Sequence, residues 1–363
     1  MPQIIQSIDL YKLKIPLKEP FVISLGPLYH AESVIVKITT DNGNEGWGEC
    51  SPFMAINGES ADTGLVVGGY LKQVLMGKDA LDIAARLADM DNVIFANNSI
   101  KSAFDMALYD IAAQTAGLPL YRFLGGNKDK TIFTDYTVSV GEVGKMASDA
   151  EAIRQKGFPV IKVKLGKHGP TDVERIKAIR AAVGMDIPLR IDANQGWQVD
   201  EAVETLKALE PYNIQHCEEP IARWNYMQLP YIRQQTSIPL MADESCCDAN
   251  DAARLLKIEA CNLFNIKLGK SGGIFKALQI IKLAEENNIR IQIGAFLESR
   301  LSMTAFAHLA ICSPNIVFFD FDTALMFSED PVAGGISYHD GGRIEVPETN
   351  GLGAVIKKAY LSA

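Results

Sequence analysis

Five charged residues recur at a regular spacing between positions 164 and 267, each near the end of a short apolar run. They are Lys164, Asp192, Glu218, Asp243 and Lys267, separated by 28, 26, 25 and 24 residues. If the runs are neighbouring parallel strands, the three acids meet at one edge of the sheet. Carboxylates that close repel one another unless a cation neutralises them or each pairs with a neighbouring base. Three oxygen ligands favour Mg²⁺ over Zn²⁺, so the spacing predicts a magnesium site.

The two lysines of this series are candidates for proton transfer. In an eight-stranded barrel they would end the second and sixth strands, which lie opposite each other, so a carbon held between them could lose a proton to one lysine and gain one from the other. Such a transfer inverts a stereocentre. It needs one neutral lysine, and burial, a nearby dication and the adjacent Lys162 are expected to lower the lysine pKa toward working pH. The alternative is a pair of solvated or ion-paired rim lysines.

Two further acids end the last apolar run of this region. Asp320 and Asp322 are two residues apart and would therefore point to the same face of a strand. On the eighth strand of a barrel they would face the predicted metal site across the mouth. A substrate with its carboxylate on the metal and a cationic group near these acids would place the intervening carbon between the lysines. This arrangement predicts a zwitterionic substrate longer than a single amino acid, the alternative being two acids that only solvate a loop.

The elements that must position these residues are eight apolar runs, each followed by a helical pattern except the last. The runs span residues 136–140, 160–165, 189–193, 214–219, 240–244, 262–268, 289–294 and 316–322. Strand and helix alternating at this period predict an α/β fold with a TIM-like (β/α)7β barrel, in which catalytic groups lie at the carboxyl ends of the strands. An open doubly wound sheet is the alternative, but no GxGxxG follows the first of these strands.

The first third of the chain has a different pattern. Alternating apolar residues in 32–38, the turn Asp41-Asn42-Gly43-Asn44 and a run ending at Cys50 predict an antiparallel hairpin. Helical spacing then predicts a helix over 99–115. We therefore expect an N-terminal α+β capping domain in 1–125, the barrel in 126–326, and a C-terminal segment, 327–363, that returns to the capping domain.

Composition excludes several other classes of protein. The formal net charge is −9, which disfavours nucleic acid as a partner. The stretch from 301 to 319 lacks charged residues but contains Pro314 and several polar residues, and is predicted to be a buried helix followed by a strand, so no membrane association is expected. The N-terminus has no signal-peptide pattern, and six scattered cysteines predict neither disulfides nor a zinc site. A cytoplasmic location is the corresponding expectation.

Together the motifs resemble the enolase superfamily, in its muconate lactonizing enzyme subgroup, and within it the dipeptide epimerases. The resemblance covers essentially the whole chain. Asp320-Phe321-Asp322 carries the narrower assignment, because it resembles the DxD motif by which dipeptide epimerases bind the α-ammonium group of the substrate. The motifs shared across the subgroup are Lys162-Val163-Lys164, Asp192-Ala193-Asn194, Glu218-Glu219-Pro220, Asp243-Glu244 and Lys267.

The resemblance implies a mechanism and roles for these residues. Mg²⁺ on the three acids binds the C-terminal carboxylate of a dipeptide, one lysine removes the α-proton of the second residue, and the opposite lysine returns a proton to the enediolate. Asn194, Glu219 and Glu244 are implied to orient the metal ligands, and Lys162 to adjust the lysines and take part in substrate binding. A homo-oligomer is also implied by the family.

One departure from the family pattern bears on the substrate. L-Ala-D/L-Glu epimerases resemble one another in carrying an arginine in a flexible N-terminal loop, where it pairs with the glutamate side chain of the substrate. Here the corresponding residues, 20–28, are mostly apolar, and no Lys or Arg occurs between Glu19 and Val36. Because an apolar loop cannot compensate a buried carboxylate, we predict a small or apolar second residue, as in Ala-Ala or Ala-Val.

Three other functions fit parts of the pattern. A cycloisomerase or an o-succinylbenzoate synthase of the same subgroup uses the lysines and the metal but has no need of Asp320 and Asp322. A dehydratase resembling mandelate racemase would need a histidine opposite the lysine, and none of the five histidines ends the sixth or seventh strand. A non-catalytic protein that binds amino compounds would need neither opposed lysines nor a metal site.

Overall fold

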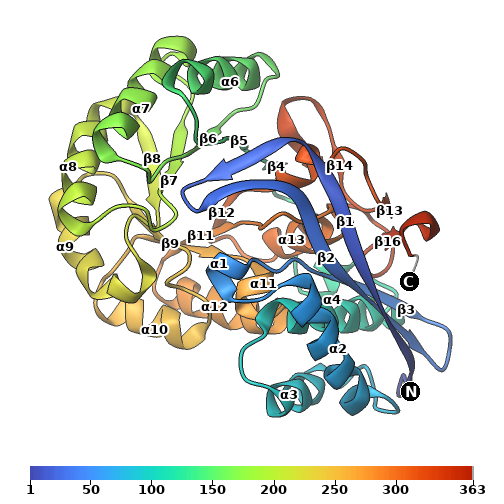
Figure 1. Cartoon of the computed structure of the whole chain (residues 1–363). Coiled ribbons are helices and arrows are strands. Elements are labelled where there is room, and N and C mark those ends of the chain that lie inside the picture. The colour runs from blue at the N-terminus through green and yellow to red at the C-terminus, as the bar shows by residue number, and fades with distance from the viewer. Residues whose placement is uncertain (362–363) are drawn as a thin grey trace.

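Eight parallel strands form the central sheet of the protein, which a computed structural model describes over residues 1–361 (Figure 1). Their order in the sheet follows their order in the chain, because a helical connection leads from each strand to its neighbour. The strands are β5 (Tyr136–Val138), β6 (Ile161–Lys164), β7 (Leu189–Asp192), β8 (Ile214–Glu218), β9 (Leu240–Ala242), β10 (Leu263–Ile266), β11 (Arg290–Ile293) and β12 (Ile316–Phe319).

Helices cover the outer face of this sheet. They are α6 (Val143–Gln155), α7 (Gly169–Val183), α8 (Val199–Leu209), α9 (Leu229–Gln235), α10 (Ala249–Lys257), α11 (Leu268–Ser271), α12 (Ile274–Glu286) and α13 (Arg300–Ala310). The first and last strands approach each other where the Asp135 N–H donates to the carbonyl of Phe319 at 3.3 Å. The predicted (β/α)7β barrel is confirmed, and each predicted run contains one strand.

The capping domain is a three-stranded antiparallel sheet with helices packed on it. Its strands are β1 (Ile5–Ile23), β2 (Gly26–Thr40) and β3 (Glu45–Cys50), and its helices are α1 (Met54–Asn57), α2 (Ala61–Leu75), α3 (Ile83–Val93), α4 (Asn98–Thr115) and α5 (Leu120–Phe123). The predicted hairpin corresponds to β2 and β3, and the predicted helix to α4. Strand β1 was not predicted, because its pairing partner is decided only when the chain folds back on itself.

Helix α4 joins the cap to the barrel. It is buried along almost its whole length, since β3 packs on one side and barrel helices on the other. Close packing against β3 depends on a glycine: a Cβ at Gly48 would lie 1.9 Å from the carbonyl oxygen of Ala103. On the barrel side, the carboxylate of Asp105 accepts the N–H of Ile274 at the start of α12. The two domains therefore share one buried helix.

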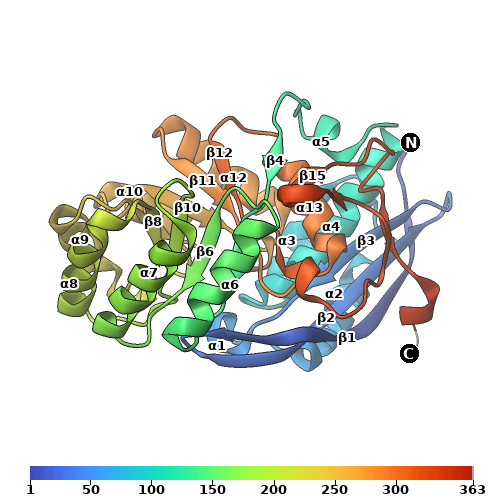
Figure 2. The ribbon, with the colours of Figure 1, turned by 90° about the horizontal axis from the view of Figure 1, so that it is seen from above.

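The β1–β2 hairpin reaches from the cap across the mouth of the barrel (Figures 1 and 2). Phe21 pairs with Leu28 and Ile23 with Gly26, so the hairpin stays paired up to its tip. The N–H of Val140, after β5, donates to the carbonyl of Val22 at 2.9 Å. The expectation of a flexible loop over 20–28 is therefore wrong, because these residues extend two strands, and only Ser24 and Leu25 form the turn.

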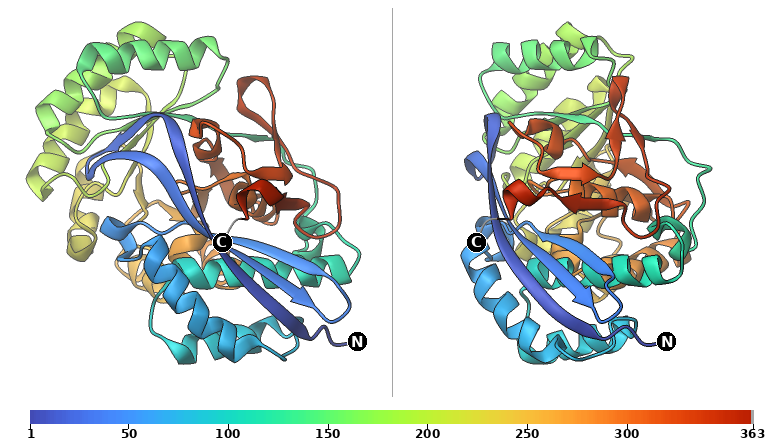
Figure 3. Two further views of the ribbon diagram at one scale, coloured as in Figure 1. Left: turned by 45° about the vertical axis from the view of Figure 1, so that its right-hand side comes forward. Right: turned by 90° about the vertical axis from the view of Figure 1, so that its right-hand side faces the viewer.

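The C-terminal segment lies against both domains, as Figure 3 shows in red. Its strands are β13 (Val332–Gly334), β14 (Ser337–Tyr338), β15 (Arg343–Glu345) and β16 (Ala354–Ile356), and β15 pairs with β4 (Ile132–Phe133). The Leu352 N–H donates to Asp110 of α4 at 2.7 Å, and the Ile336 N–H to Thr304 of α13 at 3.0 Å. The predicted domain boundaries stay predictions.

Two expectations about the whole chain can be compared with the structure. The uncharged stretch from 301 to 319 holds α13 from its second residue onward and strand β12, as predicted, and no helix within residues 1–361 is long and apolar enough to cross a membrane. All six cysteines have free thiols in the structure.

Candidate active site

Three buried carboxylates converge at the carboxyl ends of neighbouring strands. Asp192 ends β7, Glu218 ends β8 and Asp243 follows β9, and oxygens from the three lie within 4.8 Å of one another. All three side chains are inaccessible to solvent. Burial and the neighbouring acids raise the pKa of Glu218 to about 7, which reflects the repulsion within the group. Three buried oxygen donors in this arrangement fit a hard divalent cation such as Mg²⁺.

Amide side chains inside the barrel orient Glu218. Its Oε1 accepts hydrogen bonds from Gln292 on β11, at 2.8 Å, and from Asn265 on β10. Neither residue was predicted to belong to the site. A signal was present, because Asn265 is two residues before Lys267 and a strand places such residues on the same face. These two amides leave the second oxygen of Glu218 to Lys162, whose Nζ lies 2.6 Å from it.

The residues that were expected to orient the ligands lie next to them. An oxygen of Glu219 accepts the backbone N–H groups of Asp243, at 2.7 Å, and Ser245, at 3.2 Å, which fixes the chain at the end of β9. The N–H of Asn194 donates to Asp192 at 2.8 Å, and its side-chain amide donates to Glu244 at 3.3 Å. Each group therefore holds a ligand or the segment that carries it.

Lys164 and Lys267 line one cavity, as their placement on β6 and after β10 predicts. Each lysine pairs with one of the acids: Lys164 Nζ lies 2.6 Å from Asp192, and Lys267 Nζ lies 2.7 Å from Asp243. An aromatic ring also faces each ammonium group. Lys164 lies 6.0 Å from the ring centre of Phe21, and Lys267 lies 5.0 Å from that of Phe296.

The direction of the Lys267 pKa differs from the expectation. Burial acts to lower this pKa, but the carboxylates of Asp243, Glu218 and Glu244 outweigh it and raise the pKa above its usual value. The sequence-based expectation of a lowered pKa included a dication on the acids, whose charge would offset this attraction. The three carboxylates thus favour the charged form of Lys267, and burial opposes it.

Two other buried lysines supply positive charge beside the carboxylates. Lys162 Nζ lies 2.6 Å from Glu218 and 2.7 Å from Asp320, so it bridges the metal-type site and the acids of β12. Lys270, which was not predicted, contacts the second oxygen of Asp243 at 2.6 Å and also donates to the carbonyl of Asn265 at 2.9 Å. Lys270 thus holds Asp243 independently of Lys267.

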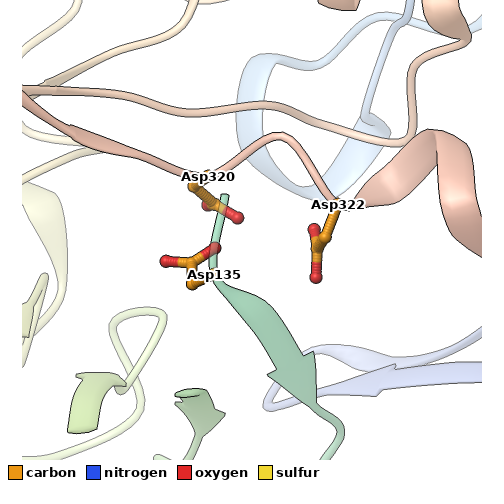
Figure 4. Close-up of side chains that lie close together, drawn as sticks. All are labelled: Asp135, Asp320 and Asp322. Atoms are coloured by element: carbon orange, nitrogen blue, oxygen red, sulfur yellow. The ribbon is translucent and has the colours of Figure 1, made fainter. Parts of the chain in front are cut away.

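Asp320 and Asp322 follow β12 and line the same cavity as the two lysines. Asp320 pairs with Lys162, whereas Asp322 accepts the backbone N–H of Thr137 on β5 at 2.7 Å. Figure 4 shows these two acids beside a third, Asp135, and oxygens of all three lie within 4.8 Å of one another. Asp135 was missed because it immediately precedes the predicted first strand.

Apolar residues of the cap close the cavity from above. The hairpin contributes Phe21, Ile23 and Leu28, and the segment around α1 contributes Phe53 and Ile56. Both parts are attached to the barrel. The Ser24 hydroxyl donates to the carbonyl of Asn194 at 3.0 Å, and Arg223 donates to the carbonyl of Ile56 at 2.6 Å. The cavity thus has charged walls on the barrel side and an apolar roof.

Two family descriptions match most of the chain. Residues 7–125 match the mandelate racemase / muconate lactonizing enzyme N-terminal domain, and residues 145–360 match the enolase C-terminal domain-like family. These ranges include the cap hairpin and every barrel residue that the sequence predicted for the site, but not Asp135 and Thr137. The resemblance drawn from the motifs is thereby confirmed at the level of the superfamily.

Comparison with individual relatives identifies the group within this family. The chain is 60% identical to a D-Ala-D/L-Ala epimerase of Cytophaga hutchinsonii, over 99% of this chain and 98% of the relative. It is 42% identical to an L-Ala-D/L-Glu epimerase of Bacillus subtilis, over 96% of each. A crystal structure of a dipeptide epimerase from Cytophaga hutchinsonii, complexed with Mg and D-Ala-L-Val, superimposes with a TM-score of 0.98, at 59% identity over 99% and 97% of the two chains. The chain therefore belongs to the mandelate racemase / muconate lactonizing enzyme family of the enolase superfamily, and within it to the dipeptide epimerases.

Proposed function

We propose that this isomerase is a Mg²⁺-dependent epimerase of dipeptides with a small or apolar second residue, whose α-carbon it inverts between Lys164 and Lys267. One observation carries the proposal: both lysines line a single cavity together with Asp320 and Asp322, beside the three buried carboxylates. The relative complexed with Mg and D-Ala-L-Val supports it from outside the chain. The homo-oligomeric state and the cytoplasmic location stay predictions from the sequence.

The residues divide the work according to the charges of a dipeptide. Asp192, Glu218 and Asp243 would hold Mg²⁺, which when bound supplies positive charge where the substrate carboxylate gains negative charge. Asp320 and Asp322 bind the ammonium group at the other end. One lysine, in its neutral form, takes the α-proton of the second residue, and the other lysine, as an ammonium group, gives a proton to the opposite face. The roof and barrel walls exclude water from the carbon between them.

The roof of the cavity supports the choice of side chain. Phe21, Ile23 and Leu28 occupy the hairpin segment where an arginine would be needed to pair with a glutamate side chain, and none of the arginines in residues 1–361 lines the cavity. A buried carboxylate without a partner costs several kcal/mol. The same residues favour methyl and isopropyl groups.

The first prediction concerns this preference. The kcat/KM for L-Ala-L-Val and the Ala-Ala diastereomers should exceed that for L-Ala-L-Glu by about 100-fold or more, because only the glutamate side chain would be buried unpaired. Polarimetry or proton NMR in D₂O across the panel measures the ratio. As a matched comparison, the isosteric L-Ala-L-Gln should fall between the two. A clear preference for Ala-Glu would contradict the proposed substrate class.

The second prediction separates this function from the other enzymes of the subgroup. Asp320→Asn should lower kcat/KM for Ala-Ala by about 100-fold or more, because a buried ammonium group loses a charged partner. N-acetyl-Ala-Ala, which has no ammonium group, should be a poor substrate of both proteins and should change little on substitution. If the variant instead retains full dipeptide turnover, Asp320 does not bind the ammonium group. If the wild type itself turns over no dipeptide, a cycloisomerase or o-succinylbenzoate synthase activity becomes the better explanation of the site.

A further inference from the structure

Asp135 stands out among the buried acids that the proposed mechanism does not use. It directly precedes β5, is inaccessible to solvent, and does not line the cavity. Figure 4 shows it below Asp320 and to the left of Asp322, with one carboxylate oxygen directed towards Asp320. Its position suggests that it acts on those two acids and does not itself touch the substrate.

The second observation is that the acidic cluster has oxygens left without partners. Oδ1 of Asp135 and Oδ1 of Asp322 are buried and accept no hydrogen bond from any residue in 1–361. Burial and the adjacent Asp320 raise the pKa of Asp135, and the same two causes raise that of Asp322 to about 7. Unpaired buried oxygens of this kind are costly. The cluster can therefore accept hydrogen bonds from one more cationic group than residues 1–361 provide.

Arg190, on β7, is the cation that Asp135 holds. The guanidinium NH1 lies 2.7 Å from Oδ2 of Asp135 and 3.3 Å from the carbonyl oxygen of Phe319, the residue before Asp320. Its Nε donates to the side chain of Gln215 at 2.8 Å. Arg190 thus donates to the residue just before Asp320, one of the two acids that the proposed function assigns to the substrate ammonium group. The carboxylate that Arg190 binds is that of Asp135, not that of Asp320 or Asp322.

The charges of the cluster leave room for one cation. Counted in their ionised forms, three acids, Asp135, Asp320 and Asp322, face two cations. These are Lys162 on Asp320, which also lies 2.6 Å from Glu218, and Arg190 on Asp135, the two pairs with the cluster each at 2.7 Å. The sum is 2 − 3 = −1. An ammonium group brings it to zero, which suits a site buried this deeply. Removing the charge of Asp135 would bring it to zero without any substrate, and would free Arg190 to compete for Asp320.

We propose that Asp135 is a positioning residue of the ammonium subsite: it holds Arg190 away from Asp320 and Asp322, so that the N-terminal ammonium group of the dipeptide is the cation these acids bind. The inference rests on the proposed function, since it assumes an ammonium group at Asp320 and Asp322. It names the residue pair that keeps this subsite negatively charged inside the barrel.

The experiment compares four proteins by their preference for a free over a blocked N-terminus, measured as the ratio of kcat/KM for Ala-Ala to that for N-acetyl-Ala-Ala. Cluster charges are −1 for the wild type, 0 for Asp135→Asn, −2 for Arg190→Gln and −1 for the double variant. We expect the ratio to fall about 10- to 100-fold in Asp135→Asn, mainly through KM, to be at least retained in Arg190→Gln, and to return to near the wild-type value in the double variant.

The outcomes distinguish the inference from the function beneath it. If the wild type prefers the free N-terminus but Asp135→Asn keeps that preference, the inference is overturned and the proposed function stands. If the ratio falls equally in all three variants, the ion pair is merely structural and the inference is again overturned. If the wild type shows no preference, the ammonium subsite itself is wrong.

A control and a fallback keep the test decisive. Asp110→Asn removes another buried acid that accepts backbone N–H groups, far from the cavity in α4, and should lower the melting temperature without changing the ratio. If Asp135→Asn fails to fold, Arg190→Gln and the double variant decide the inference. A ratio of kcat/KM well below the wild-type value in either of these two proteins would contradict the inference.

Discussion

Replacing Lys267 with alanine is expected to lower the rate of epimerisation by about 10³- to 10⁴-fold, and Lys164→Ala should do the same. Inversion needs both lysines in each direction, since one removes the proton and the other returns it on the opposite face. Neither neighbour can substitute, because Lys162 and Lys270 are each held by two or more buried acceptors. Binding of the dipeptide should survive, which separates an enzyme from a non-catalytic binding protein.

Exchange of the α-proton with D₂O provides the sharper readout. A protein with one remaining lysine can still remove the proton from the epimer that faces that lysine and return a deuteron to the same face. In each of Lys267→Ala and Lys164→Ala, one epimer of the second residue should therefore exchange its α-proton without being inverted. The epimer that exchanges should differ between the two variants. Proton NMR with both epimers follows this directly.

The matched control for the lysines is Lys167→Ala, which removes an exposed lysine just after β6 and should leave epimerisation unchanged. Circular dichroism on all three variants checks the fold. Wild-type epimerisation by either active-site variant would sink the two-lysine mechanism. Exchange of the same single epimer by both variants would do so as well, because it would point to one base acting on one face.

Removal of Mg²⁺, or the substitution Asp243→Asn, should reduce turnover by about 10³-fold or more. The three carboxylates lie buried beside one another and would hold the cation. Loss of the cation, or of one of its ligands, removes the positive charge that stabilises the negative charge formed on the substrate. That stabilisation is worth several kcal/mol. Chelation should be reversed by added Mg²⁺ in the wild type but not in the variant.

Metal binding can also be followed without turnover. Because Mg²⁺ binds the folded state and relieves the repulsion among Asp192, Glu218 and Asp243, it should raise the melting temperature of the wild type. The rise should be much smaller in Asp243→Asn. Glu204→Gln, which neutralises an exposed acid on α8, serves as the control and should behave as the wild type. Full activity after exhaustive chelation would contradict the metal assignment.

The cations within the barrel explain how so many acids can be buried before a metal or a substrate binds. Lys162 lies between the metal-type carboxylates and Asp320, and Lys270 anchors Asp243 through an oxygen that Lys267 does not use. Lys267 and Lys270 therefore contact different oxygens of Asp243. The lysines proposed for proton transfer, Lys164 and Lys267, are thus distinct from Lys162 and Lys270, which offset the buried charge.

Residues that the sequence predicted share one property: they end strands of a single periodic series. Asp192, Glu218, Asp243 and Lys267 were predictable because parallel strands joined by helices place their carboxyl ends at the same rim, whatever the details of packing. Asp320 and Asp322 do line one cavity as predicted, but both follow β12, so the period of two along a strand is not the reason. The DxD motif and the apolar hairpin segment also indicated the class of substrate.

The sequence by itself therefore determined the barrel, the residues at its mouth and the family, because these depend on local periodicity and on motifs. The tertiary structure alone decided which charges meet: that Asp135 binds Arg190, 55 residues away, that Lys270 holds Asp243, and that the 20–28 segment is a paired hairpin docked on β5. It also decided the direction of the Lys267 pKa. Such contacts join residues that are distant in the chain. Coulomb energies depend on the distance between the charges in space and on their burial, and the spacing of residues along the sequence determines neither.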